Sequence, residues 1–380
     1  MARSKGAMSL LLVGFLVTFF TGCGPSGPIA TPTPTKTPRP LVTPVAPPTD
    51  TPTPPTPTPT PESDRCPLTG EAMQEPEKAL RRPLIVKIGN DKRSRPQSGL
   101  HKADIVIEHL AEGGITRFDA VYLCHDFEKI GPVRSARLID IPLAYMFDGI
   151  FAHAGASGGG ASRGGVIWRL ENETNFPRLD ETRGDPGFVR GPMAGWPYNT
   201  FTSTSLLWQI AEERGWQEPM GRPPLLFGPL DPATPKEEKD EIFIPYFPDN
   251  RVSWRWDEES QRYLRFINGT PQDEATTGEQ IKASNVIIIW AEHRETDIIE
   301  DEYNYVHSLE IVLNAKDKDG NALWSKAFLL RDGYLIPVRW IWRWMPHMLE
   351  LSDEEGNPIP LAEGNSWIEV VPSTLEIETE

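Results

Sequence analysis

Residues 103–124, "ADIVIEHLAEGGITRFDAVYLC", contain the clearest strand pattern in this chain of 380 residues. The two halves, 103–110 and 116–124, are rich in β-branched and aromatic residues, which favour strands. Between them stands Glu112-Gly113-Gly114, a composition typical of a turn. The stretch therefore predicts two consecutive strands that can pair as a hairpin.

The sequence on both sides extends this pattern. "PLIVKIG" (83–89) and "GIFAHAG" (149–155) are predicted strands. "TSTSLLWQIAEERG" (202–215) is the clearest predicted helix, since a hydroxyl residue can cap its start and a glycine ends it. From about residue 240 the chain is mostly predicted strand, with a hairpin around 257–260.

The domain organisation follows from this division. The Pro- and acid-rich segment "GPLDPATPKEEKDE" (228–241) is the best candidate for a boundary within the folded part. We expect an α+β fold, in which a mixed α/β N-terminal part (63–235) packs with a β-rich C-terminal part (236–380).

The segment "EKIGPVRSAR" (128–137) places Arg134 and Arg137 three residues apart behind a Gly-Pro pair. Proline suits the first position of a helix, so a helix is predicted to start at Pro132, with both arginines on its first turns. Because that end of a helix carries partial positive charge, arginines there need a negative partner.

Two interpretations of that partner stay open. The arginines either bind the carboxylate or phosphate of a ligand, or form internal salt bridges with Glu108 and Glu112. The candidate ligand-binding residues are Arg95, Glu112, Thr116, Arg117, Arg134, Ser135, Arg137, His153 and Ser157.

The N-terminus carries a targeting signal. A basic start with Arg3 and Lys5 precedes a short apolar run (8–20) and then Cys23. This arrangement resembles a bacterial lipobox, with Phe20 where leucine is usual. It predicts a lipoprotein signal peptide over 1–22 and a lipid anchor on Cys23; an ordinary secreted protein or an uncleaved anchor is the alternative.

A linker is predicted to follow the anchor, over residues 23–62. Fifteen of the 39 prolines lie in 25–61, a composition that cannot build a core and favours extended polyproline II. At about 3 Å per residue it forms a spacer of up to roughly 100 Å. A ligand for a proline-binding domain is the other interpretation.

The charge of the chain limits its partners. The formal net charge is −16, and residues 1–62 contain only 4 of the 38 basic and 2 of the 54 acidic side chains, so the remainder carries −18. Such a charge excludes nucleic acid as a general partner. The expected partners are a membrane, through the lipid on Cys23, and an anionic component of the cell envelope or an acidic segment of another protein. No cofactor and no metal site are predicted.

Two cysteines, Cys66 and Cys124, remain besides Cys23. An extracytoplasmic location favours a disulfide between them, which would stabilise the fold by about 4 kcal/mol through its loop of 58 residues. Two buried free thiols are the alternative, because pairing cannot be deduced from sequence.

An envelope hydrolase is the alternative function. "GASGG" (155–159) matches the G-x-S-x-G pattern, in which Ser157 would be a nucleophile, and Glu108 and Glu112 with His153 are a second possible catalytic set. The twelve tryptophans all lie beyond residue 160 and form either an aromatic core or an exposed platform for sugar rings.

Several long motifs also resemble a known family. "RPQSGL", "ADIVIEHLAEGGITRF", "GPVRSAR", "GIFAHAGAS" and "DEEGNPIPLAEGNSWIEVVP" are similar to segments of the YerB-like lipoproteins, which contain a domain of unknown function. The resemblance covers most of 66–372 and implies an extracytoplasmic bacterial protein in two parts, with no established reaction. One departure is Tyr198 in "GWPYNTFTS" (195–203), where the family pattern has histidine.

Overall fold

A computed structural model describes residues 64–158, 164–191, 195–301 and 306–380. The predicted signal peptide, Cys23 and the whole predicted linker lie outside these residues. Within the described ranges, no helix is both long enough and apolar enough to cross a bilayer.

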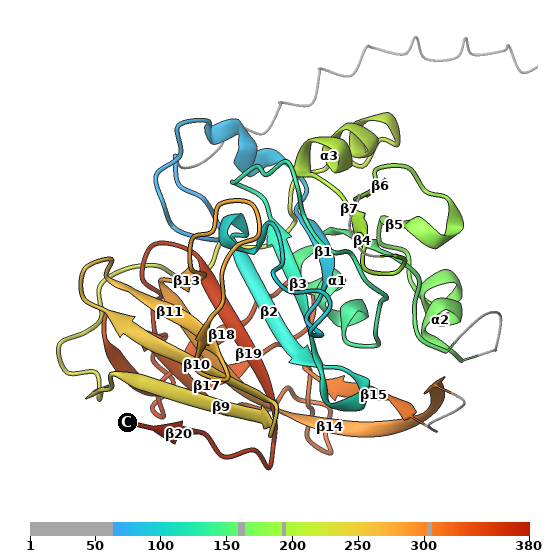
Figure 1. The fold of residues 1–380 in the computed structure, drawn as a ribbon. Helices are drawn as coiled ribbons and strands as arrows, with labels where there is room; N and C mark the ends of the chain where they lie inside the picture. Colours follow the sequence, from blue (N-terminus) through green and yellow to red (C-terminus); the bar gives the residue numbers. More distant parts are fainter. Residues whose placement is uncertain (1–63, 159–163, 192–194, 302–305) are drawn as a thin grey trace, which may run out of the picture. The chain divides into compact units, whose positions relative to one another are not determined.

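The largest element is a sheet of 12 strands built from both halves of the chain (Figure 1). Its main order is β18-β17-β16-β14-β19-β2-β3-β1-β4-β5, while β15 pairs with β14 and β8 pairs with β17. The strands are β1 (Leu84–Gly89), β2 (Ile105–Leu110), β3 (Thr116–Tyr122), β4 (Ile150–His153), β5 (Arg178–Asp180), β8 (Glu237–Glu238), β14 (Asn285–Asp301), β15 (Val306–Val312), β16 (Ser325–Arg331), β17 (Tyr334–Ile341), β18 (Glu350–Ser352) and β19 (Ser366–Pro372).

The predicted hairpin is confirmed as β2 and β3, which pair antiparallel from Ile105–Val121 to Leu110–Thr116. Around it, β1, β4 and β5 run parallel to one another, and so do β2, β19 and β14. Because β3 runs against both of its neighbours, the carboxyl ends of these six parallel strands lie at one edge of the sheet. In open α/β sheets, ligand sites form at that edge.

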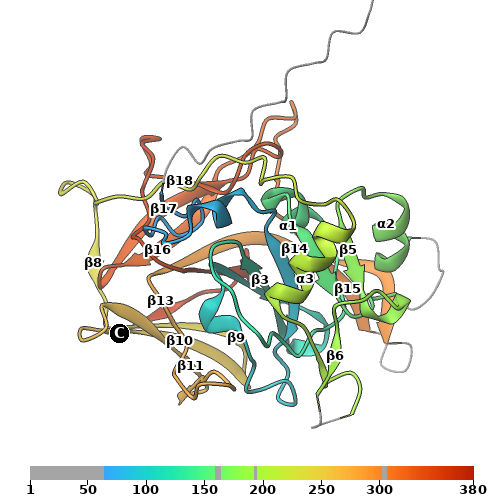
Figure 2. The ribbon, with the colours of Figure 1, turned by 90° about the horizontal axis from the view of Figure 1, so that it is seen from above.

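A second sheet of 6 strands packs beside the first (Figures 1 and 2). It contains β9 (Glu241–Phe247), β10 (Asn250–Asp257), β11 (Arg262–Ile267), β12 (Thr270–Pro271), β13 (Lys282–Ala283) and β20 (Glu378–Thr379). The hairpin expected around 257–260 is confirmed as β10 and β11. Trp254 of β10 contacts Trp367 of β19, with ring centroids 5.2 Å apart, so the two sheets share an aromatic core.

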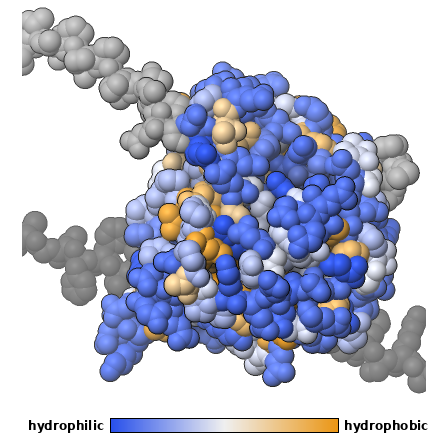
Figure 3. Space-filling view, turned by 90° about the vertical axis from the view of Figure 1, so that its left-hand side faces the viewer, coloured by the Kyte–Doolittle hydropathy of each residue, from blue (hydrophilic) through white to orange (hydrophobic). Residues whose placement is uncertain are grey.

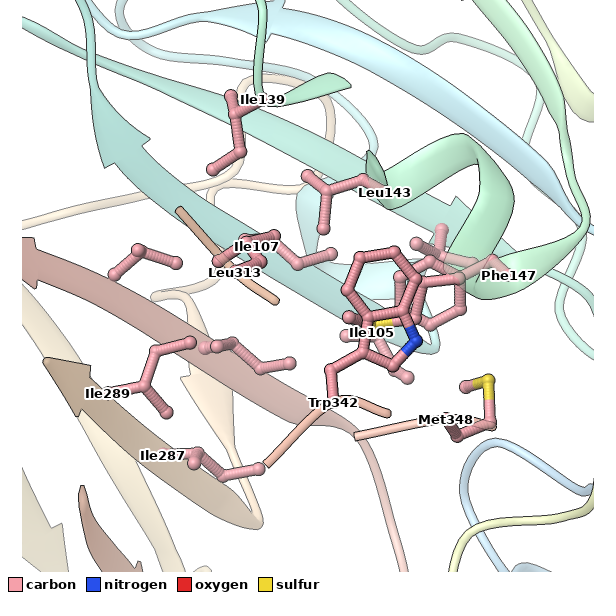
Figure 4. Packing of buried hydrophobic residues seen from close by; sticks show 14 of the residues in the cluster. Ile105, Ile107, Ile139, Leu143, Phe147, Ile287, Ile289, Leu313, Trp342 and Met348 are labelled. Carbon is pink, nitrogen blue, oxygen red and sulfur yellow. The ribbon is translucent and has the colours of Figure 1, made fainter. Parts of the chain in front are cut away.

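The two faces of the main sheet bury different partners, because successive side chains point to opposite sides. Ile105 and Ile107 face one cluster, which also contains residues of α1 (Asp140–Phe147) and α2 (Val166–Asn172). Figure 4 shows this packing, with Leu143 of α1 above Ile107 and with Phe147 of α1 to the right of Ile107. Val106 faces the other cluster, formed with α3 (Thr204–Glu213) and the second sheet. The predicted helix over 202–215 is therefore confirmed as α3.

Four short 3₁₀ helices and one separate hairpin complete the described elements. Ser203 caps α3 by accepting a hydrogen bond from the N–H of Leu206. The remaining elements are η1 (Pro76–Leu80), η2 (Leu100–Lys102), η3 (Glu112–Gly114), η4 (Glu181–Arg183), β6 (Val189–Arg190) and β7 (Thr200–Phe201). The two parts predicted over 63–235 and 236–380 thus contribute strands to one common sheet, and the α+β fold class is correct, although strands dominate.

The alternating tryptophans belong to the core. Trp254, Trp340 and Trp342 are each at most 3 % exposed, and Figure 4 shows Trp342 within the apolar cluster. Of the two interpretations for these residues, the aromatic core is therefore correct. The face of the molecule in Figure 3 is mostly hydrophilic, with hydrophobic residues gathered in a small area.

The helix predicted to start at Pro132 is wrong. Residues 130–136 are extended, and α1 begins only at Asp140. Ile130, Gly131 and Val133 form β-bridges with distant residues: Thr202, Ser98 and Ile88. These long-range hydrogen bonds occupy the backbone groups that a helix would need, so tertiary pairing overrides the local signal of the Gly-Pro pair.

Cys66 and Cys124 form a disulfide in the structure. Both residues are buried in the cluster beneath α1. The bond joins the segment before η1 to the end of the β2–β3 hairpin.

Candidate functional site

The candidate site forms where β1 and β4 separate. The two strands pair from Leu84 to Val86, and beyond that point residues 133–136 insert between them. The N–H of Arg134 donates to the carbonyl of Lys87 (2.9 Å), and the N–H of Ala154 donates to the carbonyl of Arg134 (3.0 Å). This insertion fixes Arg134, Ser135 and Arg137 at the carboxyl edge of the sheet, where α/β folds place their ligands.

Three of the predicted arginines meet there. Arg117, at the start of β3, is 3 % exposed, and repulsion from Arg134 and Arg137 acts on its guanidinium. Nη1 of Arg117 lies 3.7 Å from Oδ2 of Asp91, and Nη1 of Arg134 lies 3.4 Å from the same oxygen. Asp91 is therefore one carboxylate shared by two arginines.

Arg117 and Arg134 are poorly satisfied. Within the described part of the chain, Nε of Arg117 and both Nε and Nη1 of Arg134 are buried without a hydrogen-bond partner. Burial, together with repulsion from Arg137 and Arg134, lowers the pKa of Arg117 from 12.5 to about 9. Since buried arginines normally pair with several acceptors, this site has more donors than the described residues satisfy.

Arg137 has the opposite environment. Its guanidinium contacts Glu112 at 2.6 Å and Glu300 at 2.9 Å. Although burial opposes the charged form, these two carboxylates raise the pKa of Arg137. Burial in turn raises the pKa of Glu300. The internal salt bridge that the sequence allowed therefore exists for Arg137 with Glu112, whereas Glu108 lies elsewhere.

Glu108 and Arg95 belong to neighbouring networks. Glu108 accepts hydrogen bonds from Thr116 (2.6 Å) and from Asn90 (3.1 Å), and it forms a fully buried ion pair with Arg265 of the second sheet. Arg95 donates to the side-chain oxygens of Asn90 (2.9 Å) and Asn250 (3.3 Å). Burial lowers the pKa of Arg95. The structure thus places Arg95 and the hydroxyl of Thr116 in these networks, although the carbonyl of Thr116 accepts a hydrogen bond from Nη1 of Arg117 (3.4 Å).

Tyr198 connects the cluster to the β6–β7 hairpin. The guanidinium carbons of Arg93 and Arg134 lie 4.0 and 4.5 Å from its ring centroid. These are cation–π distances, and they hold Arg134 from the side opposite the sheet backbone. Gly89 permits the approach on the sheet side, because a Cβ there would lie 2.7 Å from Cγ of Arg134.

Next to the arginine cluster lies a buried network of charged side chains, which was not predicted from the sequence. Nζ of Lys87 lies 2.5 Å from Nε2 of His109, 2.8 Å from Asp119 and 2.6 Å from Asp140, and all four side chains are fully buried. The N–H of Arg137 donates to the other oxygen of Asp140 (2.6 Å), so the network supports the arginine loop. The sequence did contain one indication of this network, namely a charged residue within each of two mostly apolar predicted strands: Lys87 in 83–89 and Asp119 in 116–124.

The protonation states in this network follow from its hydrogen bonds. Burial and Lys87 lower the pKa of His109 to about 3, and burial and Asp119 raise the pKa of Asp140 to about 6. Nδ1 of neutral His109 donates to the carbonyl of Leu110 (2.8 Å), so its Nε2 accepts from Lys87. His109, Asp119 and Asp140 have metal-binding side chains, but the ammonium of Lys87 occupies the position that a cation would take between them.

The hydrolase alternative gains no support from this geometry. The hydroxyl of Ser157 is buried and donates only a long hydrogen bond, 3.4 Å, to the carbonyl of Ala136. In the described ranges it contacts no histidine. Nδ1 of His153 lies 2.8 Å from the carbonyl of Gly155, and burial lowers the pKa of His153. Glu108 and Glu112 are paired with arginines, so neither is free to act as a catalytic acid beside His153.

The opposite edge of the sheet holds a cavity of a different kind. It has a volume of about 340 Å³ and is lined mainly by apolar side chains, among them Phe147, Leu351 and Ile368. Arg343 at its rim already pairs with Glu350 at 3.2 Å. This cavity therefore suits an apolar group, whereas the carboxyl edge presents poorly satisfied cations.

Comparison with known proteins agrees with this fold. Two family models match the chain: the N-terminal domain of "Protein of unknown function (DUF3048)" over residues 68–217, and its C-terminal domain over 242–368. The chain is 30 % identical over 317 residues to "Putative lipoprotein YerB" of Bacillus subtilis (strain 168), covering 81 % of this chain and 86 % of that protein. A crystal structure of YerB from Bacillus subtilis matches with a TM-score of 0.67 at 29 % identity, covering 83 % of this chain and 99 % of the other. The chain therefore belongs to the DUF3048 family, the family of the YerB lipoprotein.

Proposed function

We propose that this protein is a lipid-anchored extracytoplasmic lipoprotein that binds an anionic ligand between Arg117 and Arg134. The observation that carries the proposal is the guanidinium of Arg117, which is 3 % exposed. Among the described residues its Nε has no hydrogen-bond partner, its Nη1 donates a long hydrogen bond of 3.4 Å to the carbonyl of Thr116, and the nearest carboxylate, Asp91, lies 3.7 Å away. A buried cation with so few acceptors is strongly unfavourable in the empty protein. An acid group of a ligand would supply the missing acceptors.

The ligand chemistry follows from the donors. Arginine presents a planar fork of N–H groups that fits the two oxygens of a carboxylate or phosphate. Nε of Arg134 and Nε of Arg117 have no hydrogen-bond partner among the described residues, and Nη1 of Arg134 has only the ion-pair contact with Asp91 at 3.4 Å, so three donors are available in one small region. Asp91 acts as an internal competitor, because its carboxylate is the nearest anion to both arginines.

The N-terminal sequence supports the proposed extracytoplasmic location of the anion site. The basic start, the apolar run over 8–20 and Cys23 resemble a lipoprotein signal, and the related YerB is named a lipoprotein. With an acylated Cys23 and a proline-rich spacer, the folded part would reach ligands at some distance from the membrane. Mass spectrometry of the purified protein tests this part: an unprocessed, unacylated N-terminus would contradict it.

Isothermal titration of the full chain in a neutral detergent tests the anion site. Inorganic phosphate and acetate are the probes, and the variants are Arg117→Met and Arg134→Met. Arg255→Met is the matched control, because Arg255 lies on the second sheet and pairs at the surface with Glu241 at 2.8 Å. We expect binding of at least one anion in the wild type and the control, and a loss of at least tenfold in affinity in both site variants.

A fourth variant, Asp91→Asn, distinguishes a ligand site from an internal ion pair. Removing the competing carboxylate should increase anion affinity several-fold, since both arginines lose their nearest negative charge. Absence of anion binding in the wild type and in Asp91→Asn would overturn the proposal. Equal binding by the wild type and both arginine variants would also overturn it.

A further inference from the structure

We propose that the ligand of this site is an anionic sugar: a carbohydrate unit bearing a phosphate or carboxylate group. This inference rests on the proposed function and names the class of ligand. The arginines would hold the acid group, nearby carboxylates would accept hydrogen bonds from sugar hydroxyls, and an exposed aromatic side chain would stack on the sugar ring.

The first supporting observation is Trp196. It is 64 % exposed, more than any other large hydrophobic residue in the described part of the chain. It lies in the turn 195–198, where the N–H of Tyr198 donates to the carbonyl of Gly195 (3.0 Å). Because the ring of Tyr198 contacts Arg134, Trp196 lies in the chain two residues from a side chain of the arginine cluster. The flat apolar face of an indole is suited to cover a ring rather than to bind a bare ion.

The second observation is a set of unsatisfied acceptors at the same edge of the sheet. Oδ2 of Asp180 and Oε2 of Glu181 are buried and have no hydrogen-bond partner among the described residues. The other oxygen of Asp180 accepts from the N–H of Gly155 (2.8 Å), which places this carboxylate beside the loop after β4. The other oxygen of Glu181 pairs with Arg190 of the β6–β7 hairpin.

These acceptors argue against a simple anion as the natural ligand. Unpaired carboxylate oxygens repel phosphate or acetate, but they are matched by the hydroxyl donors of a sugar. The carboxyl edge of the sheet and the turn 195–198 therefore present cationic donors and anionic acceptors without partners among the described residues, together with an exposed aromatic side chain. A sugar acid carries the three complementary features in one small molecule, whereas a nucleotide offers fewer hydroxyl donors, and the chain's net charge of −16 disfavours polyanionic nucleic acid.

Titration of the full chain in neutral detergent with matched ligands tests the inference. The series contains inorganic phosphate, glycerol phosphate, glucose phosphate, glucuronate, adenosine monophosphate and neutral glucose. We expect glucose phosphate or glucuronate to bind about tenfold more tightly than the anions without a ring, with glucose alone bound weakly. Trp196→Ala should remove this advantage and leave the affinity for inorganic phosphate unchanged. Leu226→Ala, which removes another exposed apolar side chain, is the control and should change neither affinity.

The outcomes separate this inference from the proposed function. If inorganic phosphate binds in an Arg117-dependent manner but the sugar acids bind no more tightly, the anion site stands and the sugar inference is overturned. The sugar inference also fails if adenosine monophosphate binds more tightly than the sugar acids, or if Trp196→Ala has no effect. If no anion binds, both proposals are wrong.

Discussion

Replacing Arg117 by methionine should make the empty protein more stable, although it removes a side chain from the centre of the candidate site. The pKa of Arg117 falls from 12.5 to about 9. Each tenfold change in proton affinity corresponds to about 1.4 kcal/mol, so the charged form is disfavoured by on the order of 5 kcal/mol in the folded protein. Methionine has a similar length and no charge.

Part of the expected gain in the stability of Arg117→Met is offset by lost interactions. The substitution removes the contact between Arg117 and Asp91 and some packing of the arginine stem. Replacing buried charges by apolar residues of similar size commonly stabilises proteins by about 1–4 kcal/mol. We therefore expect the free energy of unfolding of Arg117→Met to exceed that of the wild type by about 1–3 kcal/mol at pH 7.

Arg137→Met is the matched comparison. Its guanidinium lies 2.6 Å from Glu112 and 2.9 Å from Glu300, so the substitution leaves two carboxylates without their partner. A loss of about 3–5 kcal/mol is expected for such a broken buried pair. The two substitutions are chemically identical and lie in one cluster, yet they should change stability in opposite directions.

Urea unfolding of the full chain, followed by tryptophan fluorescence without added anion, measures both effects. The pH dependence gives a second check. Because burial and the neighbouring arginines lower the pKa of Arg117 to about 9, the folded protein holds this proton less tightly than the unfolded chain does, so the wild type gains stability as the pH rises above about 9. The difference in the free energy of unfolding between Arg117→Met and the wild type should therefore become smaller above about pH 9. If Arg117→Met is destabilised as strongly as Arg137→Met, Arg117 is an ordinary structural ion pair and the reasoning is refuted.

Three further outcomes are expected. Replacing Cys66 and Cys124 by serine should lower the free energy of unfolding by about 4 kcal/mol, because the disulfide closes a loop of 58 residues; an unchanged urea midpoint would contradict this. For His109, whose pKa is lowered to about 3, the unfolded chain binds a proton between pH 4.5 and 6.5 that the folded protein does not. His109 therefore makes the free energy of unfolding increase between about pH 4.5 and pH 6.5. In His109→Gln this increase should be smaller by about 2 kcal/mol, as measured by urea unfolding at pH 4.5 and at pH 6.5. Gly89→Ala should weaken phosphate binding at least several-fold in calorimetry, since the new Cβ would lie 2.7 Å from Cγ of Arg134; unchanged affinity would show that the arginine adapts without loss.

Local patterns were enough to predict the elements whose hydrogen bonds are local. The hairpin of β2 and β3 follows from two strand-forming segments around Gly113 and Gly114, and α3 follows from apolar spacing with a cap at Ser203. The pair Cys66–Cys124 was one of two alternatives that the sequence left open. The predictions of the hairpin and of α3 worked because the residues that decide each of these elements are neighbours in the chain.

The candidate site was predicted only in part. The cluster of Arg117, Arg134 and Arg137 was expected, but Arg95 lies in another network. The helix predicted at Pro132 failed because the partners of Ile130 and Val133 lie about 70 and 45 residues away along the chain, at Thr202 and Ile88. No local pattern can indicate such pairing.

The sequence by itself determined the acidic charge, the β2–β3 hairpin and α3, and it predicts an N-terminal lipoprotein signal, because these properties depend on residue type and short spacing. Only the tertiary structure decided which arginines are paired. Arg137 meets two carboxylates, from η3 and from the end of β14, whereas Arg117 shares one with Arg134. That difference arises where strands from both halves of the chain meet at one sheet edge, and a guanidinium is satisfied only by the groups that the fold brings within hydrogen-bonding distance.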